Sequence, residues 1–413
     1  MNSNDDRCLK QPTPPHEVEW SWLNSIDQIP KTDWDRCFSG GGVLQSYALQ
    51  KATERSGIPS ACYHYLTGRV NGRIEAIMPC FEFRISLVLV APAFVQKIVC
   101  MIRRIFRDFL FIRAFIAGTP VAICKDLFGL RGDARQLLGQ AAMEIADRAS
   151  HCGSGLIILK EITAPEVEEV SRQLGERFII AESPATTFLS LGTDEHSTYR
   201  ASLRKKYRSV MTGRLRKFEQ SGMYWKKVGN LKPYSQQLTA LYMQVLERSK
   251  IRFELLTVNF FEEISQQMPE SMFAMLCFKG KELVAFEMFL HDENALHPLY
   301  LGLDYRHRDQ GALYFNCIYK IIELAEERDF EYVELGQTSY ATKAGLGAVI
   351  SPLYLAVCHS NPVMRWALRK LKPVLFPGTP TPRCQRTFKD IDALSSRLSE
   401  LGVPFILGER HDD

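Results

Sequence analysis

Residues 300–336, YLGLDYRHRDQGALYFNCIYKIIELAEERDFEYVELG, have the pattern of a strand, a polar loop, a long helix and a second strand. The first strand ends near Asp304, the helix covers 311–328, and EYVELG supplies the second strand. Strands separated by helices are typical of α/β units with mixed sheets. No G-x-G-x-x-G follows a strand, which disfavours a doubly wound nucleotide-binding fold. The stretch therefore predicts an α/β (α+β) protein with mixed sheets.

A similar order of elements occurs roughly 180 residues earlier in the chain. A helix at 133–150 precedes the strand GLIILK, just as the later helix precedes EYVELG. The turn at Asn71-Gly72 corresponds to the turn at 279–281, and Asn-Gly favours a hairpin because a type I′ turn needs positive φ at both central positions. The repetition predicts two tandem units of one fold.

The repeat also sets the expected domain boundaries, since 413 residues exceed one ordinary core. We expect a disordered lead at 1–19, a first unit at 20–183 with an apolar and basic insertion near 81–118, a second unit at 184–360 that carries the active site, and a C-terminal amphipathic helix and tail at 361–413.

Cysteine usage and the first thirty residues indicate the compartment. The eleven cysteines form no C-x-x-C pair, and none of their spacings is typical of a zinc site. An odd number of cysteines without a framework favours reduced thiols. The first thirty residues contain no apolar run like that of a secretory signal. We therefore expect a cytoplasmic protein without a metal.

A strongly basic helix is predicted at 195–220, and no acid occurs between Arg200 and Glu219. Like charges at i,i+4 repel, so this density favours a polyanionic partner such as a cofactor phosphate, tRNA or a lipid headgroup. A solvated surface face is the alternative. The cations are Arg200, Arg204, Lys205, Lys206, Arg208, Arg214, Arg216 and Lys217.

Two loops of the second unit carry further candidates. Arg306, His307 and Arg308 precede a long helix, whose N-terminal N–H groups suit a phosphate. After EYVELG, Lys343 stands in a segment where glycines allow a ligand to approach the backbone. A lysine there can polarise a carbonyl or hold a phosphate oxygen. An ordinary capped loop and a surface lysine are the alternatives.

Residues 186–358 resemble the Fem-type peptidyltransferase and FemAB-like branch of the GNAT acyltransferase superfamily. Three motifs carry the resemblance: the K-x-x-R spacing from Lys205 to Arg208, the aromatic-rich helix before EYVELG, and K-A-G-L-G at 343–347, which is similar to the family's Phe-Lys-Gly-Phe-Gly run. The N-terminal half resembles the duplicated first unit of that branch. The resemblance implies two tandem GNAT-like units.

The resemblance also implies an enzyme that transfers an acyl or aminoacyl group directly to an amine, without a covalent intermediate. The GNAT pyrophosphate loop has the pattern Arg/Gln-x-x-Gly-x-Gly/Ala, whereas this chain has Arg308, Gly311 and then Leu313. This departure leaves acyl-CoA, an acyl-carrier thioester and aminoacyl-tRNA open as donors, with no tightly bound cofactor and no DNA partner. A non-catalytic module that binds RNA or anionic lipid is the alternative.

Direct transfer needs a base for the amine and an acid for the leaving group. Glu287 is the candidate base, Tyr300, Tyr305 and Tyr340 are candidate acids, and Asp304 and Glu334 can bind the amine. Lys343 is carried over by its motif as the residue near the donor carbonyl. The expected donor-binding residues are Arg204, Lys205, Arg208, Arg306, Arg308, Gly311, Gly345 and Gly347.

Two stretches, 96–115 and 361–377, combine apolar and basic residues at helical spacing. Such helices can lie on an anionic bilayer surface, which would place the protein at the inner membrane face. The pattern favours ordinary core packing, with peripheral membrane contact as the alternative.

Overall fold

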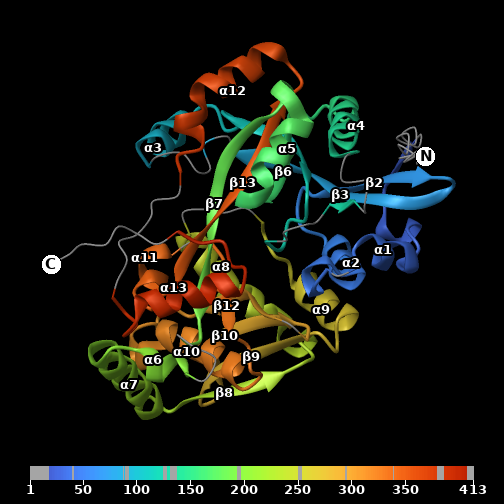
Figure 1. The fold of residues 1–413 in the computed structure, drawn as a ribbon. Coiled ribbons are helices and arrows are strands. Elements are labelled where there is room, and N and C mark those ends of the chain that lie inside the picture. Colours follow the sequence, from blue (N-terminus) through green and yellow to red (C-terminus); the bar gives the residue numbers. More distant parts are fainter. Residues whose placement is uncertain are drawn as a thin grey trace, which may run out of the picture.

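The computed structural model describes residues 18–39, 41–86, 88, 93–123, 128–130, 137–192, 197–249, 254–293, 295–337, 339–378 and 386–406. Within them, nine strands form a sheet in the order β1-β2-β3-β4-β6-β13-β7-β12, with β5 paired to β3. Four strands form a smaller sheet in the order β11-β10-β9-β8. Figure 1 shows the long strands β7 and β13 running from the upper part of the molecule toward the smaller sheet.

The strands of the larger sheet are β1 Glu19–Leu23, β2 Cys62–Val70, β3 Arg73–Ser86, β4 Phe111–Ala117, β5 Gly129–Leu130, β6 Leu156–Thr163, β7 Ile179–Ser190, β12 Tyr332–Glu334 and β13 Val349–His359. Those of the smaller sheet are β8 Met223–Val228, β9 Met272–Lys279, β10 Glu282–His291 and β11 Leu296–Leu303.

The helices are α1 Lys31–Cys37, α2 Tyr47–Arg55, α3 Ala93–Ile102, α4 Leu138–His151, α5 Val167–Leu174, α6 Tyr199–Ser202, α7 Lys205–Gln220, α8 Ser235–Arg248, α9 Val258–Gln267, α10 Leu313–Glu326, α11 Tyr340–Ala344, α12 Pro362–Leu375 and α13 Ile391–Glu400. Several begin at polar N-caps, as the side chains of Ser46, Thr257 and Asn361 accept from the first-turn amides of α2, α9 and α12.

The predicted α/β class with mixed sheets is confirmed. β4 and β6 pair in parallel, with α4 between them along the chain, while the other paired strands are antiparallel. Asn71 and Gly72 form the predicted hairpin turn between β2 and β3, and both have positive φ. Residues 1–17 of the expected lead lie outside the described residues, and β1 begins at Glu19.

The two halves of the chain share one sheet. β13, the last strand along the chain, lies between β6 and β7 and pairs antiparallel with both. The expected boundary at 183–184 falls inside β7. The expected division into two units therefore crosses a continuous sheet.

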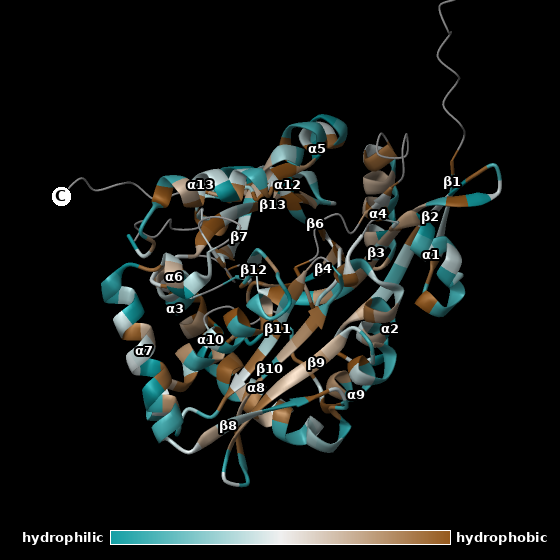
Figure 2. Cartoon of the chain, turned by 60° about the horizontal axis from the view of Figure 1, so that its bottom comes forward, coloured by the Kyte–Doolittle hydropathy of each residue, from teal (hydrophilic) through white to brown (hydrophobic). Residues whose placement is uncertain are grey.

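The single basic helix expected at 195–220 is two helices, because α6 ends at Ser202 and α7 begins at Lys205. Residues 193–196 lie outside the described residues. Leu203 is buried and its backbone forms an isolated β-bridge with Phe388, which requires an extended conformation. Figure 2 shows hydrophilic and hydrophobic residues alternating along α7. The tertiary contact with Phe388 therefore overrides local helix propensity.

One hydrophobic cluster joins the halves. Leu49 of α2 and Ile58 pack with Phe260 of α9 and Phe286 of β10. Two side chains of the α9 region cross the same contact, since Thr257 Oγ1 donates to the Ser56 carbonyl at 2.6 Å and Asn259 donates to the Arg55 carbonyl at 2.7 Å. This contact holds the smaller sheet against the first half.

Candidate functional site

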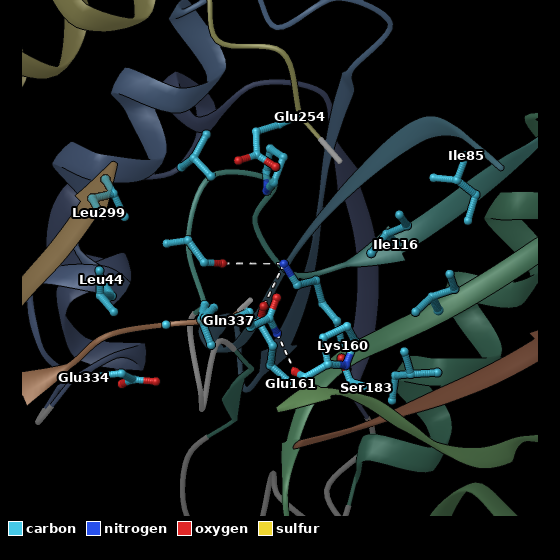
Figure 3. Close-up of a pocket in the computed structure, with 18 of the residues that line it drawn as sticks. Leu44, Ile85, Ile116, Lys160, Glu161, Ser183, Glu254, Leu299, Glu334 and Gln337 are labelled. Carbon is cyan, nitrogen blue, oxygen red and sulfur yellow. Dashed lines mark hydrogen bonds and ion pairs between the residues drawn. The ribbon is translucent and has the colours of Figure 1, made fainter. Parts of the chain in front are cut away.

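A cavity of about 370 Å³ lies where the two sheets meet, and we call it the junction cavity. β11 is the edge of the smaller sheet and β12 the edge of the larger one. Among the described residues β12 pairs only with β7, so the two edges part and leave space between them. Figure 3 shows side chains from both halves of the chain around this space.

The junction cavity has an apolar end and a charged end. The apolar end is lined by Ile85, Ile116, Leu156, Ile158, Leu355 and Phe376. The ionisable residues of the lining are Lys160, Glu161, Glu182, Glu254, His297 and Glu334. Four carboxyl groups against one lysine favour a cationic ligand over an anionic one.

A β-bulge in β6 brings Lys160 and Glu161 to the cavity. Two residues of β6 oppose Leu355 alone in β13, because Ile162 pairs with Tyr354 and Leu159 with Ala356. Glu161 has a φ of 67°, a left-handed conformation that is uncommon for a residue with a side chain. Adjacent residues of a regular strand point to opposite faces, but the bulge turns both side chains into the same space.

The Lys160 and Glu161 side chains form an ion pair in this bulge. Lys160 Nζ lies 2.7 Å from Glu161 Oε1 and donates to the Thr119 carbonyl at 2.8 Å, as Figure 3 shows for the ion pair. Both side chains are largely buried. Gly118 has a φ of 138°, and a Cβ there would lie 2.6 Å from Lys160 Cγ. Residue 118 must therefore be glycine, because any larger residue would clash with the Lys160 side chain where it passes the backbone.

Glu254 and Tyr300 form a second polar pair. The Tyr300 hydroxyl lies 3.0 Å from Glu254 Oε1 and 2.7 Å from the Val121 carbonyl. A tyrosine has one proton to donate, so both contacts are hydrogen bonds at once only when the Glu254 carboxyl is protonated. Burial raises the pKa of Glu254, although the Tyr300 hydrogen bond opposes the shift. Both side chains keep some accessible surface because they line the cavity.

A second cavity, of about 660 Å³, adjoins the first. Leu44, Ile123, His297 and Glu334 line both. Tyr332, Asp292 and the segment 401–404 line only the second one. Glu334 at the end of β12 therefore stands between two spaces that together can hold a substrate larger than either.

Lys343 supports the cavity wall from behind. Its ammonium donates to the carbonyls of Leu335, Gly336 and Gln337 at 2.8, 3.0 and 2.9 Å, and these three residues line the cavity. Burial lowers the pKa of Lys343 to about 7, and Glu334 opposes the shift. The three N–H groups of the lysine expected beside the donor are thus engaged by backbone carbonyls of the cavity wall.

Three other candidates also lie away from the two cavities. The Tyr340 hydroxyl donates to the Ala185 carbonyl at 2.9 Å. Tyr305 stacks under the Arg248 guanidinium, 4.1 Å from the ring centre. Glu287 on β10 is 2% exposed, and neither carboxylate oxygen has a hydrogen-bond partner among the described residues. The structure does not bring Glu287, Tyr305, Tyr340 and Lys343 together, and their catalytic roles stay predictions.

The expected phosphate loop is neutralised by acids. Arg306 pairs with Asp304 at 2.5 Å and with Glu282 at 2.7 Å, and Arg308 pairs with Asp309 at 2.9 Å. The Arg306 hydrogen bonds lower the pKa of Asp304, which keeps that carboxylate charged and bound. The loop therefore offers a donor phosphate less free positive charge than its sequence implies.

The remaining donor-binding candidates are spread over the second half. Arg204 donates to the Phe388 carbonyl at 2.9 Å, while Lys205 is exposed at the start of α7 and Arg208 is half-buried one turn further on. Gly347 has a φ of 94°, and a Cβ there would lie 2.3 Å from the Phe388 ring. This glycine is explained by packing.

Gly311 and Gly345 complete that set. Gly311 has a φ of 62°, and a Cβ there would lie 3.0 Å from Ser221 Oγ. Gly345 has an ordinary helical conformation, with a φ of −63°, so its backbone does not require glycine.

Two clusters of metal-ligating side chains occur outside the junction cavity among the described residues: His64 with Glu82 and Cys152, and Glu282 with Asp304 and His307. In the first cluster Glu82 already accepts from Ser154 at 2.9 Å. In the second, Arg306 occupies both carboxylates.

The sequence prediction named Tyr300 and Glu334 but missed Lys160, Glu161, Glu254 and His297. The adjacent charges of Lys160 and Glu161 interrupt the otherwise apolar run LIILKEIT. Two charges within a buried strand are costly unless paired, so this interruption was a usable signal.

Glu287 gives a test of stability. Burial raises its pKa well above the ordinary 4.5, so the folded protein keeps a proton that the unfolded chain releases. The contribution of Glu287 to the free energy of unfolding is therefore greatest below pH 4.5 and decreases as the pH rises toward the pKa of Glu287 in the folded protein. Glu287→Gln cannot ionise, so we expect the melting temperature of the variant to fall less than that of the wild type between about pH 5 and pH 8.

Thermal melts of both proteins across this range check the expectation, with Glu282→Gln on the same strand as the exposed control. An unchanged pH profile in Glu287→Gln would contradict it. Turnover of the variant tests separately whether Glu287 also serves as a base.

The chain is similar to proteins of one known family. A family model of FemAB-like proteins, described as peptidoglycan biosynthesis/recognition, matches residues 133–359. The C-terminal domain of a putative lysylphosphatidylglycerol synthetase from Agrobacterium fabrum is similar in structure, with a TM-score of 0.50 and 12% identity over 87% of this chain and 99% of that one. FemX is similar with a TM-score of 0.50 and 10% identity, over 85% of this chain and 100% of its own.

No curated protein sequence matches the chain. At these identities the two structures show the fold, and the family model covers more than half of the sequence. The fold expected from the resemblance, an α/β protein of the FemAB-like, tandem GNAT-like type, is confirmed. The chain belongs to the FemAB-like family.

Proposed function

We propose that this protein is an acyltransferase that moves an acyl or aminoacyl group from an activated donor to an amine, and that the transfer takes place in the junction cavity. The observation that carries the proposal is the set of carboxyl groups gathered in a partly open cavity between the two sheets. A primary amine is an ammonium ion at neutral pH, and Glu334 and the exposed Glu182 are suited to bind it, since Glu161 is paired with Lys160.

The same groups can handle the protons of the reaction. The bound ammonium group first gives one proton to a base. The free amine nitrogen then attacks the donor carbonyl, the bond to the thiol or hydroxyl leaving group breaks, and the nitrogen gives up a second proton while the leaving group takes one up. A carboxyl group with a raised pKa, such as Glu254, suits this exchange because its ionisation is shifted toward the operating pH. Tyr300, next to Glu254, can return a proton to the leaving group.

Three classes of donor are compatible with this proposal. An acyl-CoA, an acyl-carrier thioester and an aminoacyl-tRNA each supply an activated carbonyl. The exposed cations Lys205, Lys206, Arg216 and Lys217 on α7 are free to meet the phosphates of any of them. Because Arg306 and Arg308 are ion-paired with acids, we propose this helix rather than the loop as the contact for donor phosphates.

The test offers each isotope-labelled donor in turn with a panel of amines, and mass spectrometry detects the labelled amide. We expect product with one donor class. If that class is aminoacyl-tRNA, ribonuclease will abolish the product and added salt will weaken it steeply. Binding of RNA or lipid without product from any donor would favour the non-catalytic alternative instead.

A further inference from the structure

The segment between β3 and β4 exposes an apolar stripe. Phe94, Ile98 and Met101 follow the i, i+4, i+7 spacing of one face of α3, and Ile105, in the turn that follows, is 80% exposed. Phe106 and Phe109 extend the stripe through the turn after α3. The opposite face of α3 is closed, because Val95 and Val99 pack with Val88 and Leu110. The core packing favoured by the sequence pattern is therefore wrong for the outer face of this helix.

Helix α12 repeats this arrangement. Leu368 and Leu375 pack inward in a cluster with Ile116 and Leu156. Trp366, on the other face, is 63% exposed, and Val363 and Val374 are also exposed. Most of the Trp366 side chain therefore contributes no buried area to the packing of the described residues.

The cations around both apolar faces are unpaired. Lys97, Arg104 and Arg107 are exposed beside the α3 stripe, and α12 carries Arg365, Arg369, Lys370 and Lys372 without any acid. None of these cations pairs with a carboxylate in the part of the chain that the structure describes. Asp108, the acid of the turn, pairs with Arg84.

The two surfaces belong to one end of the molecule. Ile85 and Ile112, which flank the α3 segment, share a hydrophobic cluster with Leu375 and Phe376 at the end of α12. Figure 1 shows α3 and α12 in the upper part of the molecule and α7 in the lower part. Ile85 and Phe376 also line the apolar end of the junction cavity.

We propose that α3, the turn at 103–110 and α12 form a docking surface for an anionic lipid bilayer. Apolar side chains surrounded by cations match a bilayer interface. There the apolar side chains are buried among the lipid acyl chains, and the cations contact the anionic headgroups. No helix among the described residues is long and apolar enough to cross a bilayer, so the contact is with the surface. A second copy fits poorly, because a symmetric contact would bring like charges together. The proposal does not depend on the transferase activity.

Flotation with vesicles tests the surface, using phosphatidylcholine alone and phosphatidylcholine mixed with phosphatidylglycerol. We expect the protein to float at least ~10-fold more with the anionic vesicles and to lose this binding as salt rises. The double variants Ile105→Ser/Phe106→Ser and Arg369→Glu/Lys370→Glu should each lose at least ~10-fold of the binding. Circular dichroism verifies that each variant is folded.

The matched control is Arg216→Glu/Lys217→Glu, which reverses two exposed cations on α7 and should leave flotation unchanged. Equal flotation with both vesicle types, an equal loss in the α7 control, or no loss in the two variants would overturn the proposal. A dimer without lipid that Ile105→Ser/Phe106→Ser dissociates would overturn it in favour of self-association. Transfer to a water-soluble amine by a protein that does not float would overturn docking alone and leave the proposed function standing.

Discussion

Replacing Glu254 by glutamine is expected to lower the turnover number by ~10²- to 10⁴-fold while leaving the fold intact. Glutamine has the same shape as the protonated carboxyl group and can still donate to the Tyr300 oxygen. It cannot take a proton from the attacking amine. The loss should therefore appear in turnover with little change in the melting temperature.

The pH dependence of the same reaction gives the sign of the effect. Burial raises the pKa of Glu254, so the carboxyl group is protonated at low pH and becomes a base as the pH rises through this value. We expect kcat/KM of the wild type to rise with pH on an acidic limb that lies above the ordinary carboxyl range. Glu254→Gln should lose this limb, which a merely structural role would not produce.

The matched control is Glu182→Gln, which changes an exposed carboxyl group of the same cavity. We expect it to affect KM more than turnover. If Glu254→Gln keeps the wild-type turnover number, Glu254 is not the base of the reaction. Tyr300→Phe keeps the ring and removes the hydroxyl, so a smaller but parallel loss would link the two side chains.

Local patterns predicted much of the fold. The strand, loop, helix and strand of 300–336 appear as β11, α10 and β12, because apolar periodicity and turn residues act within a short segment. The hairpin at Asn71-Gly72 is likewise local. The same patterns singled out Tyr300, in the middle of β11, and Glu334, at the end of β12, and both line the cavity.

The rest of the site depends on contacts between distant segments. The bulge that turns Glu161 into the cavity exists only because β13 inserts beside β6. Arg306 was expected to be free, but Glu282 from a neighbouring strand pairs with it. Lys343 resembled a ligand-binding loop lysine, yet the burial of its segment turns it onto the carbonyls of 335–337. No local pattern encodes any of these pairings.

Replacing Lys343 by methionine is expected to lower the free energy of unfolding by roughly 2 to 5 kcal/mol. Methionine preserves most of the apolar stem but removes all three N–H donors. The carbonyls of Leu335 and Gln337 then lose this charged partner inside the protein. Gly336 keeps a partner, because its carbonyl also accepts from Thr187 Oγ1 at 2.7 Å. Two uncompensated carbonyls in these half-buried residues, at about 1 to 3 kcal/mol each, give about 2 to 6 kcal/mol, and relief from burying the ammonium group lowers the net loss into the expected range.

Chemical denaturation measures this loss, and Lys205→Met at the exposed start of α7 is the control with the same change of side chain. The control should stay within about 0.5 kcal/mol of the wild type. Because 335–337 form the wall of the junction cavity, the wall should loosen before the whole protein unfolds. Amide exchange in 335–337 of Lys343→Met should therefore be faster than in wild type under conditions where α4 stays protected. Unchanged stability and exchange would mean that the lysine does not hold this wall, and would return it to the donor-binding role that its motif suggests.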